Sequence, residues 1–124
     1  MELDHDLEQR LRLLEASGQV DPDVAAFVRT AVRDLAAAAD AAPTDALFGT
    51  LCTHTAMALQ RARRGEALTA WDADHSAELA AHPRAVQAAQ ALVRRAADEL
   101  AVQLPATEEQ FVGLHLAALD AKDA

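Results

Sequence analysis

Aromatic residues are scarce in this sequence. Among 124 residues there is no tyrosine, and the four aromatic side chains are Phe27, Phe48, Trp71 and Phe111. Because β-strands favour aromatic and β-branched residues, this composition disfavours a sheet. Alanine, in contrast, occurs 32 times. We therefore expect a core built by helices that pack closely through small side chains.

Cysteine and long apolar runs are also nearly absent. The single Cys52 excludes an internal disulfide and is typical of a reducing compartment. No run of about 18 apolar residues exists, so no membrane-spanning helix is expected. The acidic start at residues 1–6 has no apolar segment of the secretory type. These features predict a cytoplasmic location and no association with a membrane.

Positively charged residues are also few. The chain has 11 basic against 20 acidic residues, a formal net charge of -9, and Lys122 is its only lysine. Proteins that bind the phosphate backbone of nucleic acids rely on clustered lysine and arginine. The one basic run, at residues 61–64, is too short to reverse the overall charge. Direct nucleic-acid binding is therefore not expected.

The spacing of apolar residues predicts an all-α fold, an antiparallel bundle of five to six helices in a single domain over residues 1–124. Asp21 and Pro22 suit a helix start, and Gly18 and Gly65 suit helix ends. The expected helices cover roughly residues 3–16, 22–41, 44–64, 75–81, 83–102 and 107–120.

Five of these helices receive a predicted apolar face, which in the helix near 44–64 comprises Leu47, Leu51, His54, Ala58 and Arg61. For the helix near 83–102 the face comprises Val86, Val93, Ala97 and Leu100. For the helix near 107–120 it comprises Phe111, Leu114, His115 and Ala118. Thr107 and Gln110 have the spacing of a capping box at the start of the latter helix.

His54 and His115 lie on apolar helix faces, where an imidazole is costly unless its nitrogens find partners. His54 shares a face with Arg61, two turns and about 10 Å away along the helix. An arginine near a histidine can hold a phosphoryl group by paired hydrogen bonds. Periodicity alone favours a simpler interpretation, a core histidine bonded to a backbone carbonyl beside a surface arginine.

Other chemistry has weaker support. Cys52 is two residues before His54, roughly opposite on a helix, so we expect it to pack and not to act as a nucleophile. The acidic and histidine-containing stretches 4–6 and 72–75 lack the helical spacing of metal ligands. Glu108 suits the first turn of a helix, where a carboxylate complements the dipole. We therefore predict no catalytic residues, no metal and no cofactor.

Two ordered motifs nevertheless resemble those of the PTS regulation domain (PRD), a helical module of bacterial antiterminators and activators. The first motif has a leucine, a phosphoacceptor histidine and then an arginine, here Leu51, His54 and Arg61. The second motif is matched by Leu104, Pro105, Glu108, Phe111, Leu114 and His115. The resemblance extends over residues 45–120, and the chain looks like a free-standing, single-copy member.

The resemblance implies a regulator and not an enzyme. A phosphorylated carrier of the phosphotransferase system, of the HPr or enzyme IIB type, would phosphorylate His54 or His115. Arg61 and Glu108 would support the site, and Thr53 stands where the family often has an acidic residue. The phosphoryl group would control homodimerisation or the binding of a transcription-regulating partner.

Two alternatives stay open. In the first, the chain is a degenerate domain of this kind that acts only as a dimerisation or scaffold module. Thr53 and the absence of the family's usual Asn-Pro at residues 66–75 support this alternative. In the second, it is an unrelated helical enzyme or metal-binding protein.

Overall fold

Six α-helices make up the fold in the computed structural model, which describes residues 2–66 and 75–122. Their bounds are α1 His5–Ala16, α2 Pro22–Ala38, α3 Asp45–Arg63, α4 Ser76–Leu79, α5 Pro83–Leu100 and α6 Ala106–Lys122. No strand occurs within these two described ranges, and the all-α prediction is confirmed. Trp71 lies outside the described residues.

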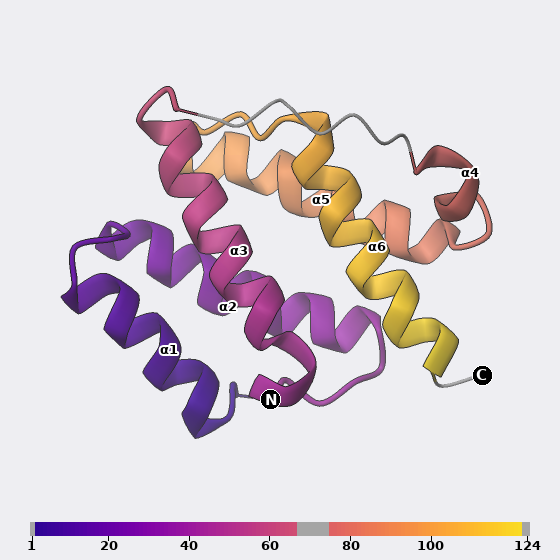
Figure 1. The fold of residues 1–124 in the computed structure, drawn as a ribbon, viewed down its shortest axis with the longest axis horizontal. Helices are drawn as coiled ribbons and strands as arrows, with labels where there is room; N and C mark the ends of the chain where they lie inside the picture. The colour runs from indigo at the N-terminus through magenta and orange to yellow at the C-terminus, as the bar shows by residue number, and fades with distance from the viewer. Residues whose placement is uncertain (1, 67–74, 123–124) are drawn as a thin grey trace.

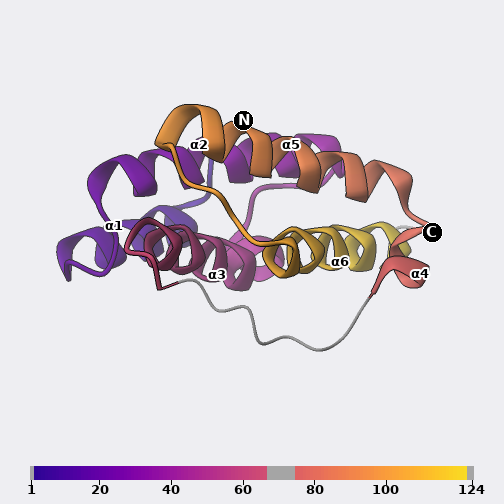
Figure 2. The same cartoon turned by 90° about the horizontal axis from the view of Figure 1, so that it is seen from above.

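The helices form two layers. α1, α3 and α6 lie side by side in one layer, and α2 and α5 form the second layer behind them (Figures 1 and 2). The short α4 packs against α6 and α5 at one end of the molecule. The α3 helix contacts α1, α2 and α6, so it occupies the centre of the front layer.

Hydrogen bonds of one side chain, Asp4, connect the first turns of α1 and α3. The Asp4 carboxylate accepts the backbone N–H of Leu7, which caps α1, at 2.9 Å. Its second oxygen accepts the backbone N–H of Asp45, the first residue of α3, at 3.0 Å. One side chain therefore satisfies free N–H groups of two helices. The turns that end α1 and α3 contain Gly18 and Gly65, with φ of 77° and 74°.

The core is built mainly from leucine, valine and alanine, as the composition predicts. Its largest fully buried side chains are Phe48, Leu7, Leu11, Leu51, Leu59, Val24, Val28, Val32 and Cys52. On α6, Gly113 lets the helix approach its neighbours closely. A Cβ added at Gly113 would meet Leu79 Cδ2 at 3.1 Å and Ala89 Cβ at 3.9 Å.

The predicted inward face of α5 was wrong by one residue. The predicted residues are only half-buried, and the buried face consists of Ala85, Ala89, Leu92 and Ala96. Alanines let α5 lie close to its neighbours, which leaves the valines at the margin of the contact.

The prediction for α6 needs two corrections. The buried residues of this helix are Val112, Gly113, Leu116, Ala117 and Leu119. Phe111, Leu114 and His115 are half-buried, and Ala118 is exposed. The capping box is also wrong, because α6 already begins at Ala106 and the buried Thr107 hydroxyl has no hydrogen-bond partner among the described residues.

Candidate functional site

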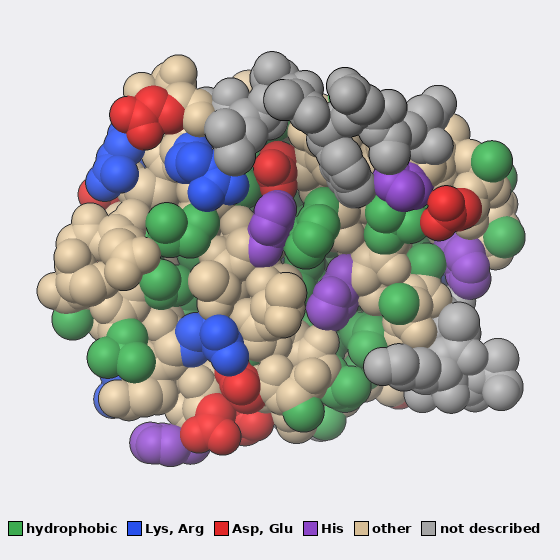
Figure 3. Space-filling view, viewed as in Figure 1, with side chains coloured by type: hydrophobic (Ala, Val, Ile, Leu, Met, Phe, Trp, Pro, Cys, Tyr) green, Lys and Arg blue, Asp and Glu red, His purple; other side chains and the backbone are tan. Residues whose placement is uncertain are grey.

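Both candidate histidines lie where α3 and α6 pack against each other. His54 of α3 contacts Glu108 of α6, and His115 of α6 contacts the backbone carbonyl of Leu47 on α3. The two contacts are seven residues apart on each helix and run in opposite orders, so α3 and α6 are antiparallel. Figure 3 shows two histidine side chains in the strip between these helices.

The His54 ring is held from two directions. Its Nε2 lies 2.5 Å from Oε2 of Glu108, and the side chains are 32% and 13% exposed respectively. The ring also stacks on Phe111, with centroids 3.7 Å apart and planes 18° from parallel. Glu108 and Phe111 are three residues apart and so share one face of α6. The site is therefore formed by one residue of α3 and one turn of α6.

This geometry fixes the proton of the His54 ring. A carboxylate oxygen only accepts, so Nε2 must carry the hydrogen. In the neutral ring the lone pair then belongs to Nδ1, which has no hydrogen-bond partner among residues 2–66 and 75–122. A carboxylate beside an imidazole also stabilises positive charge that develops on the ring. The arrangement thus gives His54 the features of an oriented nucleophile or base.

The contacts of His115 are those of a histidine with a structural role. Its Nε2 donates to the Leu47 carbonyl at 2.8 Å, and its ring lies 6.0 Å from that of Phe48. A half-buried imidazole bonded to a backbone carbonyl matches the simpler interpretation given above. No interaction between His115 and His54 is found among the described residues. By the antiparallel register, the two rings are offset by about two turns, or roughly 10 Å.

Two of the supporting residues do not contact His54. Thr53 accepts a hydrogen bond from Nη1 of Arg10 at 3.1 Å, so it serves the α1–α3 contact. Arg10 also binds Asp45 through two bonds of 2.8 and 3.0 Å. The Arg10 guanidinium lowers the pKa of the Asp45 carboxyl. Arg61 is half-buried and has no ion-pair partner in the described part of the chain.

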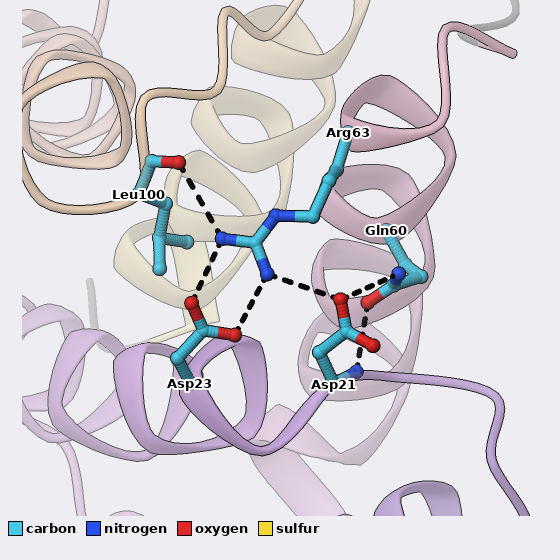
Figure 4. A network of polar contacts seen from close by, with 5 residues as sticks. All are labelled: Asp21, Asp23, Gln60, Arg63 and Leu100. Atoms are coloured by element: carbon cyan, nitrogen blue, oxygen red, sulfur yellow. Dashed lines mark hydrogen bonds and ion pairs between the residues drawn. The ribbon is translucent and has the colours of Figure 1, made fainter.

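A neighbouring arginine, Arg63, has a different role that the sequence did not reveal. It binds Asp23 through two bonds of 2.7 and 2.9 Å and also reaches Asp21 at 3.1 Å (Figure 4). Gln60 exchanges two further hydrogen bonds with Asp21. Bonds from Gln60 and then Arg63 lower the pKa of Asp21, and a bond from Arg63 lowers the pKa of Asp23. Arg63 therefore joins α3 to the start of α2.

The other residues considered as a nucleophile or as metal ligands have no such role in the described structure. Cys52 is fully buried, and burial raises the pKa of its thiol to about 12, so it is a poor nucleophile. Within the described ranges, no group of three or more histidine, cysteine or acidic residues is placed to hold a metal ion. Asp72 and Asp74 of the 72–75 stretch lie outside the described residues.

Comparisons with known proteins add no assignment. No family model, no curated protein and no solved structure matches this chain. In the described residues, no helix has both the length and the apolar character needed to cross a membrane.

The motifs predicted that Glu108 lies close to His54, and the structure brings the two side chains into contact. The stack of the His54 ring on Phe111 was not predicted. The signal was present, because Glu108 and Phe111 occur at i and i+3 on one helix face. Which of the many residues on α3 would meet that face depends on the register of two helices, which no local pattern encodes.

Proposed function

We propose that this chain is a phospho-responsive regulatory domain in which His54 accepts a phosphoryl group from a carrier protein of the phosphotransferase system. The observation that carries the proposal is the contact between His54 Nε2 and Glu108. It fixes the ring orientation, places the proton on Nε2 and leaves Nδ1 with the lone pair. The ordered motifs around both residues, with their resemblance to the PRD family, supply the phosphotransferase context.

This geometry supports the following transfer step. Nδ1 of neutral His54 attacks the phosphorus of the carrier's phosphorylated side chain. A bond from nitrogen to phosphorus forms as the donor's bond to phosphorus breaks, and the electron pair stays on the donor. The ring is cationic once the bond from nitrogen to phosphorus has formed, and the Glu108 carboxylate stabilises that charge. Loss of the Nε2 proton to solvent through Glu108 then returns the phosphorylated ring to its neutral form. The exposed third of the His54 side chain provides the side from which a partner approaches.

The product carries close to two negative charges by analogy with other phosphorylated side chains. Arg61 supports the proposal as a countercharge, because it lies on the same helix face and has no partner in the described ranges. The new charge beside an apolar helix contact would bias a symmetric homodimer or the binding of a regulator in the cytoplasm. The phosphoryl group is then a signal and not a step in turnover.

A direct experiment is incubation of the purified protein with a phosphorylated carrier of the HPr type and, separately, of the enzyme IIB type. We expect one acid-labile phosphate per chain by intact-mass measurement. It should be absent in His54→Ala and retained in His115→Ala. Phosphorus and nitrogen NMR should assign the phosphate to Nδ1. An unmodified wild-type protein with both carriers would refute the proposal.

The second candidate function is a scaffold or dimerisation module without phosphorylation. The contacts of His115 favour it, since among the described residues the hydrogen bond of this histidine goes to a backbone carbonyl. Under this alternative, the His54–Glu108 pair only locks α3 against α6. A wild-type protein that dimerises but accepts no phosphate would support it.

A further inference from the structure

A second feature lies on the other side of α3, where α1 packs against α2. A hollow of about 360 Å³ opens between these helices. It is lined by Glu2, Leu3, Glu8, Arg12, Arg29 and Arg33. None of these residues takes part in the His54 site. Three of the ten arginines of a strongly acidic chain therefore border one hollow.

The arginines of the hollow have unused hydrogen-bond donors. Arg29 uses only its Nε, which bonds both oxygens of Glu8 at 2.9 and 3.0 Å. Arg12 and Arg33 have no ion pair and no side-chain hydrogen bond among the described residues. Elsewhere, Arg10 and Arg63 each form two-pronged bonds to a carboxylate. The hollow thus combines three guanidinium groups with a single described ion pair.

We propose that this hollow binds a small phosphate monoester that also carries hydroxyl groups. Guanidinium groups bind phosphate oxygens in pairs, and two of the three have no carboxylate to displace. The volume falls in the range of small-molecule sites. Glu8 and Glu2 can accept hydrogen bonds from hydroxyl groups. The same carboxylates, with the net charge of -9, oppose an extended polyanion such as a nucleic acid or an anionic membrane.

The test is titration of the protein with glucose 6-phosphate, inorganic phosphate and glucose, followed by amide NMR and calorimetry. We expect glucose 6-phosphate to bind more tightly than inorganic phosphate and glucose not to bind. The shifted amides should belong to α1 and α2. Arg33→Gln and Arg12→Gln should each weaken binding roughly tenfold, because each removes charge-assisted hydrogen bonds. Arg94→Gln is the matched control, since Arg94 is an exposed arginine of α5 with no described partner.

Circular dichroism of each variant establishes that it is folded, which is expected since Arg12 is exposed and Arg33 half-buried. The proposal is overturned if the wild-type protein binds neither phosphate compound at millimolar concentration. It is also overturned if Arg94→Gln weakens binding as much as Arg33→Gln does, because that result indicates general charge attraction. Equal affinity for the ester and for inorganic phosphate would show that the hydroxyl groups of the ligand make no contact with the hollow, which would overturn that part of the proposal. None of these outcomes depends on phosphorylation of His54.

Discussion

At the scale of single residues, the chemistry that we propose for His54 depends on the charge of one carboxylate. Glu108 is only 13% exposed, so its interaction with the imidazole is less screened than a surface pair would be. Phe111 adds a flat apolar surface under the ring. Together they hold a side chain that would otherwise sample several rotamers, and this orientation is what a nucleophile requires.

The first prediction concerns Glu108→Gln. Glutamine keeps the size of the side chain and an oxygen that accepts from Nε2, but it removes the negative charge. We expect phosphorylation of His54 to slow roughly tenfold, because a charge-assisted hydrogen bond becomes a neutral one. The rate is followed by intact-mass measurement with a fixed amount of phosphorylated carrier. Glu109→Gln is the control, since this half-buried neighbour has no described side-chain bond. Equal rates in both variants would exclude a role for the Glu108 charge.

The second prediction concerns Cys52 and the stability of the fold at alkaline pH. Burial raises the pKa of its thiol to about 12, whereas a cysteine in an unfolded chain titrates near 8.5. The unfolded state therefore loses its proton first, and stability is full below about pH 8.5 and declines as the pH rises toward 12. The chain has no tyrosine and one lysine, so few other groups titrate in this window.

The decline should approach about 1.4 kcal/mol per pH unit between pH 9 and 11, measured by urea unfolding. Cys52→Ala is the control. It should be less stable at neutral pH, because it leaves a small cavity, but it should lack most of the alkaline decline. A parallel decline in both proteins would assign the effect to other groups.

At the scale of helices, the sequence predicted which segments form helices better than it predicted which face of each helix is buried. The predicted face of α3 was useful, since Leu51 and Ala58 are buried and His54 and Arg61 lie at the margin of the same contact. For α5 and α6 the face was displaced, because alanine and glycine form the closest contacts and large residues flank them. Periodicity finds large apolar residues readily, whereas small residues that allow close approach give a weak signal.

The third prediction belongs to this scale and concerns Arg63, which ties α3 to α2. Arg63→Ala should lower the free energy of unfolding by roughly 1 kcal/mol at pH 7, since its carboxylate partners are about half exposed. The pKa of each partner is lowered in the fold, so this stabilisation is present above about pH 4 and is lost as the pH falls further. Urea unfolding at pH 7 and pH 3 measures both values.

Arg64→Ala is the matched control, because Arg64 is exposed at the same helix end and has no described side-chain partner. It should change stability by less than about 0.5 kcal/mol. If Arg63→Ala and Arg64→Ala behave alike, the contacts of Figure 4 contribute nothing measurable.

At the scale of the whole molecule, the two candidate sites lie at different helix contacts. His54 lies where α3 packs against α6, and the arginine-lined hollow lies where α1 meets α2. A small domain of this kind buries a limited core for its size, so a partner surface would add to its stability. We therefore expect a homodimer, and light scattering at tens of micromolar distinguishes it from a monomer.

The last prediction joins phosphorylation to that assembly. A dianionic group on His54 next to an apolar contact must be solvated or paired, because an uncompensated buried charge costs about 3–5 kcal/mol. Arg61 shares the helix face of His54, and its side chain has no described partner to release. Arg61→Ala should therefore lower the phosphorylated fraction or abolish the change in oligomeric state that we propose phosphorylation causes. Its unphosphorylated fold should stay intact, as judged by circular dichroism.

Native mass spectrometry in the presence of a phosphorylated carrier follows both quantities in one spectrum, since phosphate and subunit number each change the mass. Arg64→Ala removes the same charge from the same helix end and should behave as the wild type. An unchanged phosphorylated fraction and an unchanged shift in Arg61→Ala would remove Arg61 from the switch while leaving His54 as the acceptor. Loss of the shift in both variants would indicate that overall charge, and not a specific pairing with the phosphoryl group, controls assembly.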